Sequence, residues 1–162
     1  MKAALPLLIF LLAPHAWSAS ETDDSARAFV LDWVAAYNRN DPALMAGFYA
    51  EDPRVTVMVS VGQTFRGYQA IAELYRSDMQ VVEFYDSYAK ELQVWTEGDT
   101  ALVSFEHFFK YYVRPDKSRW NIHIRTTMTL RRDGDGWKII QEHSSPIQGI
   151  PRATRIQSST GS

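Results

Sequence analysis

The stretch RWNIHIRTTMTLRR, residues 119–132, decides the fold class of this chain. Apolar and polar residues alternate along it, as in a β-strand with one face in a core and the other face outward. The apolar face carries Trp120, Ile122, Ile124, Met128 and Leu130, and the other face carries Asn121, His123, Arg125, Thr127 and Thr129. The pattern therefore predicts a sheet that covers its core from one side.

Three further strand candidates lie beside this stretch, at 86–97, 100–113 and 136–144. The turns that join the four strands are Gly98-Asp99, Pro115-Asp116-Lys117 and Asp133-Gly134-Asp135-Gly136. Connections this short join antiparallel neighbours, so the sequence predicts an antiparallel meander. The β-branched segment 55–61 predicts one more strand earlier in the chain.

Helical patterns come mainly before these strands. The first helix is predicted from residue 26 by apolar residues at three- and four-residue spacing: Phe29, Val30, Trp33, Val34 and Tyr37. Asp41 and Pro42 begin a second helix as its cap and its first residue. A third helix is predicted over 68–79. Helices grouped ahead of an antiparallel sheet give the α+β class, in the order α-α-β-α-β-β-β-β.

The composition excludes several classes of protein. The 162 residues suffice for one domain, and the 46% hydrophobic and 22% charged residues are typical of a globular protein. The net charge of −2 argues against a nucleic-acid partner. The chain contains no cysteine, which excludes disulfides, thiol catalysis, cysteine zinc sites and iron–sulfur clusters.

The two ends of the chain differ from the part between them. Residues 1–18 have the layout of a signal peptide: Lys2, an apolar run over 3–13, and small residues in Ala16-Trp17-Ser18. The apolar run is too short to span a bilayer. We expect cleavage after Ser18, with Ala19 or Ser20 as the second choice, and a periplasmic or secreted protein without a membrane partner. The domain is expected over 21–147, and the polar residues 148–162 are expected to form a flexible tail.

Three stretches of the chain resemble one family. They are WVAAYNRNDP (33–42), FYAEDP (48–53) with FRGYQAI (65–71), and RTT (125–127) through RRDG (131–134) to WKIIQEHSSP (137–146). Together they resemble the SnoaL-like branch of the nuclear-transport-factor-2-like superfamily. This resemblance implies a cone, in which a bent sheet encloses a helix and leaves a pocket at its wide end. It also implies a homodimer packed through the sheet.

The resemblance does not fix the activity, because the superfamily includes isomerases, cyclases, dehydratases, epoxide hydrolases and non-catalytic scaffolds. Steroid isomerases carry a Tyr and two Asp residues where this chain has Trp33, Val57 and Met128. None of these three can move a proton, so the resemblance argues against that isomerase chemistry. The end of the sheet also resembles the association domain of calmodulin-dependent kinase II, which is a self-assembly module.

Two polar residues of the late strands are candidates for the site. His143 shares the side of its strand with Trp137 and Ile139 if alternation is regular, and it is either a general base and ligand contact or a buried histidine bonded to the backbone. Arg125 is either a clamp for a carboxylate or oxyanion, or the partner of Glu142 on the neighbouring strand.

Aromatic and histidine residues give further candidates. Trp33, Tyr37 and Tyr49 are expected to point from the helices toward the sheet, as core or as the wall of a ligand pocket. His107, His123 and His143 lie on successive strands, but they lack the short spacing of a zinc site. We therefore expect no metal and no cofactor.

These observations leave three functions open. The favoured interpretation is a protein that binds a small, partly apolar molecule in the cone, with Arg125 and His143 as polar anchors. The second is an acid–base enzyme of the isomerase, cyclase or dehydratase type that uses His143. The third is a non-catalytic assembly module. Aromatic residues on both faces of 100–113 favour a homodimer, because a partner would cover the outer face.

Overall fold

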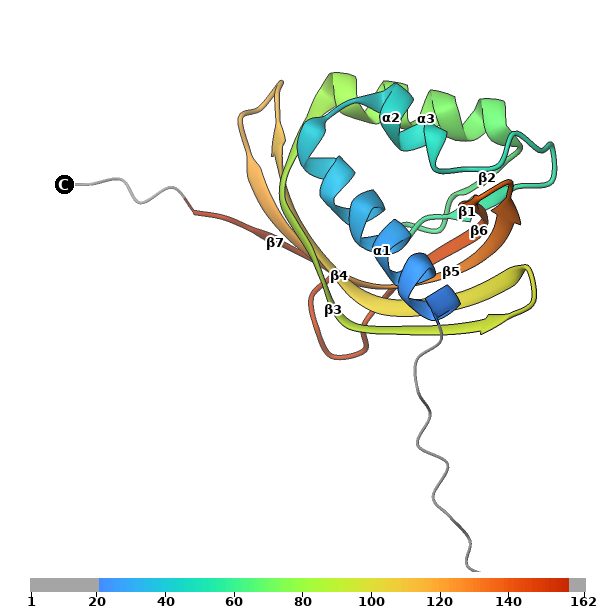
Figure 1. Cartoon of the computed structure of the whole chain (residues 1–162). Helices are drawn as coiled ribbons and strands as arrows, with labels where there is room; N and C mark the ends of the chain where they lie inside the picture. The colour runs from blue at the N-terminus through green and yellow to red at the C-terminus, as the bar shows by residue number, and fades with distance from the viewer. Residues whose placement is uncertain (1–20, 158–162) are drawn as a thin grey trace, which may run out of the picture.

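The computed structural model of the chain describes residues 21–157 (Figure 1). The helices are α1 (Glu21–Ala36), α2 (Pro42–Gly47) and α3 (Tyr68–Val81), with the short 3-10 turn η1 (Tyr37–Arg39) after α1. The strands are β1 (Thr56–Met58), β2 (Thr64–Arg66), β3 (Val82–Glu97), β4 (Thr100–Val113), β5 (Arg119–Asp133), β6 (Gly136–Pro146) and β7 (Ala153–Arg155). The predicted signal peptide, 1–18, lies outside the described residues.

A strongly curved sheet wraps around α1, and α2 and α3 lie side by side across its open end (Figure 1). The α+β class predicted from the sequence is therefore confirmed. Within residues 21–157, no helix is long and apolar enough to cross a membrane.

The strand order is β2-β1-β6-β5-β4-β3, and β7 pairs with β5. The meander β3-β4-β5-β6 is antiparallel, as predicted. The sheet as a whole is mixed, which corrects the prediction of a purely antiparallel sheet, because β1 runs parallel to β6. A parallel pair needs a long crossover, and the chain from β2 to β5 supplies it.

The C-terminal segment also differs from the prediction. Residues 148–157 do not form a free tail, because β7 pairs antiparallel with Trp120–Ile122 of β5. The rest of the predicted tail, 158–162, lies outside the described residues. The strand continues the sheet past residue 147, the predicted end of the domain.

The core lies between the inner face of the sheet and the helices. Its fully buried members include Val30 and Trp33 of α1 and Leu130 and Ile139 of the sheet. The inner face of β5 consists of the even-numbered residues that the alternation predicted, from Ile122 to Leu130. The sequence pattern therefore fixes which side of β5 contacts the helices.

Asp41 caps α2 as predicted, since its Oδ1 accepts hydrogen bonds from the backbone N–H groups of Ala43 (2.9 Å) and Leu44 (3.0 Å). We expect Asp41→Ala to lower the free energy of unfolding by about 1 kcal/mol, because these two donors lose their acceptor. Asp41→Asn keeps an oxygen at this position and serves as the control. Urea denaturation of the three proteins measures the effect, and equal stability of Asp41→Ala and wild type would contradict the capping role.

Candidate functional site

A cavity of about 370 Å³ lies between α3, η1 and the inner face of the sheet. Its walls are mostly apolar, and they include Val57, Phe84, Phe109, Ile122 and Ile124. Polar groups interrupt this surface: the lining also contains Tyr37, Ser60, Gln63, Tyr75, Asp78, His107, Tyr111, Glu142, Ser144 and Arg152. A pocket of this size, with apolar walls and polar groups among them, is suited to a small, partly apolar molecule.

A bulge in β6 determines which of its residues face the cavity. Leu130 of β5 pairs with Ile139, but the preceding residue Thr129 pairs with Gln141, so Ile140 is an extra residue. The bulge reverses the alternation that begins with Trp137 and Ile139. Glu142 consequently points inward, and its residue is only 4% exposed.

The carboxylate of Glu142 is held by hydroxyl groups. Tyr49 donates a hydrogen bond to its Oε2, and Ser144 donates a longer one to its Oε1 (3.4 Å). The hydroxyl of Tyr49 lies 2.7 Å from that of Tyr75, and the hydroxyl of Thr126 lies 3.1 Å from that of Ser144. The network joins the end of α2, helix α3 and the two central strands around one carboxyl group.

Burial raises the pKa of Glu142 from 4.5 to about 7. The hydrogen bonds from Tyr49 and Ser144 oppose this rise, because they stabilise the charged form. No Lys or Arg forms an ion pair with Glu142 in the described part of the chain. Near neutral pH the group is therefore present in both protonation states, as a general acid or base requires.

The neighbouring hydroxyl groups stay protonated. Burial is the main cause that raises the pKa values of Tyr37, Tyr49 and Tyr75, and the nearby Glu142 carboxylate raises them further. Tyr37 and Tyr75 line the cavity. Because Tyr49 donates its one hydroxyl proton to Glu142, Tyr75 donates to Tyr49, and these neutral hydroxyl groups form a chain that ends at the carboxylate.

His107 also faces the cavity, but it has a different character. Its Nε2 lies 2.9 Å from the hydroxyl of Ser87, and burial lowers its pKa to about 3. The imidazole is therefore neutral at physiological pH. It is suited to hydrogen bonding and not to carrying a proton to and from a substrate.

The structure does not bring Arg125 and His143 to the cavity. Both side chains are exposed on the outer face of the sheet, where Arg125 pairs across the strands with Ser145. His143 lies beside a shallow hollow of that outer face, together with Trp95 and Gln141. For His143 the hypothesis assumed regular alternation through β6, which the bulge at Ile140 interrupts. Arg125 lies outside because it is on the face of β5 opposite to Ile124, as the alternation of 119–132 requires.

The predicted aromatic wall is divided between two roles. Tyr37 lines the cavity, whereas Trp33 and Tyr49 are fully buried in the core behind it. From this buried position Tyr49 donates a hydrogen bond to the Glu142 carboxylate at the edge of the cavity. Arg125 is not the partner of Glu142, which corrects one alternative drawn from the sequence.

The three histidines do not converge. His107 faces inward, whereas His123 stacks on Phe108 on the outer face, with 3.9 Å between ring centroids. Among residues 21–157 no group of three or more His, Cys, Asp or Glu side chains has the geometry of a metal site.

Sequence reasoning missed Glu142 as a site residue and treated it only as a salt-bridge partner. The available signal is the doublet Ile139-Ile140, which breaks the alternation of β6 and marks a position where a bulge can occur. Tyr75 lies within the predicted third helix, where periodicity indicates burial but not which group its hydroxyl bonds.

Comparisons with known proteins agree with this architecture. Residues 26–149 match the model of the SnoaL-like domain family. None of the curated proteins matches the sequence significantly.

Solved structures resemble the chain over most of its length. A provisionally assigned aromatic ring hydroxylase from Novosphingobium aromaticivorans is 16% identical, with a TM-score of 0.74 over 86% of this chain and 96% of that one. A provisionally assigned dehydratase of the nuclear-transport-factor-2-like family from Streptomyces avermitilis is 20% identical, with a TM-score of 0.70 over 80% and 99%. A ketosteroid isomerase-like protein from Erwinia carotovora atroseptica is 21% identical, with a TM-score of 0.67 over 79% and 98%. At these identities the likeness shows the shared fold.

The raised pKa of Glu142 predicts a pH-dependent stability. Between pH 4.5 and about 7 the folded protein holds a proton on Glu142 that the unfolded chain releases, so the free energy of unfolding falls as pH rises through this window. His107 acts in the opposite direction between about 3 and 6.5, since its pKa is lowered on folding. A comparison with Glu142→Gln isolates the contribution of Glu142.

We expect the stability of wild type relative to Glu142→Gln to fall by on the order of 3 kcal/mol between pH 4.5 and 8. Denaturant unfolding at several pH values measures this difference. A difference that does not change with pH would show that the Glu142 carboxyl has an ordinary pKa.

Proposed function

The chain belongs to the family of SnoaL-like domains, and on that premise we propose that it is an acid–base enzyme which moves a proton on a small, partly apolar molecule in the cavity. Glu142 is the proposed proton carrier. The observation that carries the proposal is a buried carboxyl group with a pKa of about 7 in the wall of an apolar cavity. The acid–base role that the sequence analysis gave to His143 passes to Glu142.

The proposed reaction needs two kinds of group. Ionised Glu142 takes a proton from a C–H or O–H of the substrate and later returns it to another atom, which is the step common to isomerases and dehydratases. Tyr37, as a neutral hydroxyl on the cavity wall, would donate a hydrogen bond to an oxygen on which negative charge develops. Tyr49 would orient the Glu142 carboxylate from behind.

Binding without turnover is the second candidate function, because the apolar walls of the cavity suit a binding protein as well as an enzyme. The carboxyl group favours the enzyme. A binding site for an apolar ligand gains nothing from a buried carboxyl group, whose desolvation is costly. Two of the similar structures are named as a dehydratase and as an isomerase-like protein, and both of these activities involve proton transfer.

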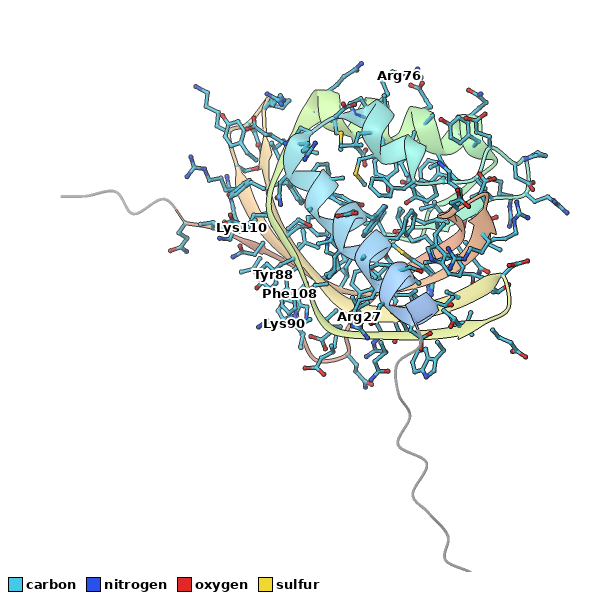
Figure 2. The ribbon with its side chains drawn as sticks, in the orientation of Figure 1. Arg27, Arg76, Tyr88, Lys90, Phe108 and Lys110 are labelled. Carbon is cyan, nitrogen blue, oxygen red and sulfur yellow. The ribbon has the colours of Figure 1, made fainter. Side chains whose placement is uncertain are left out.

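We further propose that the mature protein is exported and forms a homodimer through the outer face of the sheet. Large apolar side chains are exposed there: Tyr88 is 46%, Trp95 45% and Leu102 55% exposed. Tyr88 stacks on Phe108 with 4.9 Å between ring centroids, and both lie on the outside of the sheet (Figure 2). A second copy of this face would cover a surface that is unusually apolar for a monomer.

Proton transfer can be tested without knowledge of the natural substrate. The probe 5-nitrobenzisoxazole opens to a coloured cyanophenolate when a base removes its ring C–H proton and the N–O bond breaks. We expect wild type to accelerate this reaction, with a rate that rises as Glu142 ionises around pH 7. Glu142→Gln should lose on the order of 100-fold or more of the rate, because the proposed base is removed.

Glu106→Gln is the matched control, because Glu106 is a carboxylate of the outer face that lies 2.9 Å from Nε2 of His123. This variant should retain the wild-type rate. If Glu142→Gln and wild type have equal rates, Glu142 is not the base. If the probe binds to wild type without reacting, the cavity is a binding site only.

The dimer is tested by substitution on the outer face. We expect Leu102→Arg to convert a dimer to a monomer in analytical ultracentrifugation, since it places a charge within the proposed apolar interface. Leu31→Arg is the matched control, because Leu31 is 46% exposed but lies on α1. A wild-type monomer, or a Leu102→Arg variant that stays dimeric, would contradict the proposed interface.

A further inference from the structure

Arg152 is a cation in the wall of the cavity that the proposed proton transfer does not use. It comes from the C-terminal segment, one residue before β7, and it is half-buried. The cavity lining contains no other Lys or Arg. A single cation in a mostly apolar wall indicates a specific role in ligand recognition.

The backbone holds this residue in place. The carbonyl oxygen of Arg152 accepts a hydrogen bond from the backbone N–H of His123 at 3.0 Å, and the next residue, Ala153, pairs with Ile122 in the sheet. The position of Arg152 is therefore set by the sheet, although its segment follows the part of the chain that matches the family model.

The guanidinium group has no carboxylate partner in the described part of the chain, where none of the ion pairs includes Arg152. Asp78 also lines the cavity, but no ion pair joins it to Arg152 in the described part of the chain. The charge of Arg152 does act on Tyr111, whose pKa it lowers against the larger effect of burial. Arg152 thus presents its charge beside a second hydrogen-bond donor.

Arg152 and Glu142 lie toward opposite ends of the cavity. Along β5, the backbone of Arg152 is next to His123, whereas Glu142 pairs with Met128. Five residues of strand correspond to about 17 Å along the backbone, and Arg152 and Glu142 both line the cavity. The lining residues between these points are the apolar Ile124, the neutral His107 that pairs with it, and Ser144, which pairs with Thr126.

We propose that Arg152 selects ligands that combine an apolar body with one terminal carboxylate. The carboxylate binds the guanidinium of Arg152, and the apolar body extends along the wall toward Glu142. This inference rests on the proposed function for the reacting end of the ligand, but it concerns the opposite end. The substrate class is an aryl or alkyl carboxylic acid whose reactive atom lies away from its carboxylate.

The orientation follows from charge. A carboxylate next to Glu142 would bring two negative groups together in a buried site, which disfavours the ionisation of both. At Arg152 the same carboxylate meets an uncompensated cation that can donate two parallel hydrogen bonds. The half-buried position keeps part of this attraction from being screened by solvent.

The test compares two probes of the same length and shape that differ at one terminal group: the anion 6-phenylhexanoate and the neutral 6-phenylhexanamide. Isothermal titration calorimetry at pH 7 should show that wild type binds the acid roughly tenfold more tightly than the amide. Arg152→Gln should abolish this preference, and Arg152→Lys should keep part of it. Arg155→Gln, three residues along the same segment and outside the cavity, is the matched control and should keep the full preference.

Equal affinity of wild type for acid and amide, or no binding of the acid, would overturn the role of Arg152. A preference that persists in Arg152→Gln would also overturn it. The proposed function is judged separately by the benzisoxazole reaction, whose probe has no carboxylate. If the rate depends on Glu142 but the acid is not preferred, only the inference on Arg152 is refuted. If the acid preference depends on Arg152 but the rate does not depend on Glu142, only the proton transfer is refuted.

Discussion

The extra residue of β6 at Ile140 is the constraint on which the site depends. Without the bulge, regular alternation would place His143 inside and Glu142 outside. With it, the carboxyl group of Glu142 enters the cavity and finds the hydroxyl groups of Tyr49 and Ser144. One backbone irregularity thus decides which chemistry the curved sheet offers. Bulges next to functional sites act in this way in many sheets, because they redirect a side chain.

Stability and function oppose each other at Glu142. Burial of the carboxyl group disfavours its charged form, and the bond from Tyr49 offsets only part of this penalty. The remainder shifts the pKa into the range in which proton transfer is efficient near neutral pH. The apolar core formed around Trp33, Leu130 and Ile139 supplies the stability that tolerates such a group.

Periodicity predicted the parts of the fold that depend on one buried face. The alternation in residues 119–132 identified the inner face of β5, and the Asp41-Pro42 pair identified the start of α2. The sequence could not predict β7, because a three-residue polar strand forms only where a neighbouring edge is available. The misplacement of His143 has the same origin: a bulge depends on the register of two strands and leaves little trace in either one.

The central claim is that the carboxyl group in the cavity exchanges its proton near neutral pH. A carbon-13 NMR titration of glutamate side-chain carboxyls, with the Glu142 signal assigned by its absence in Glu142→Gln, measures this most directly. The account predicts a midpoint of about 7 for Glu142. A midpoint at the ordinary glutamate value of about 4.5 would contradict it, because the group would then be a permanent anion and no proton carrier at neutral pH.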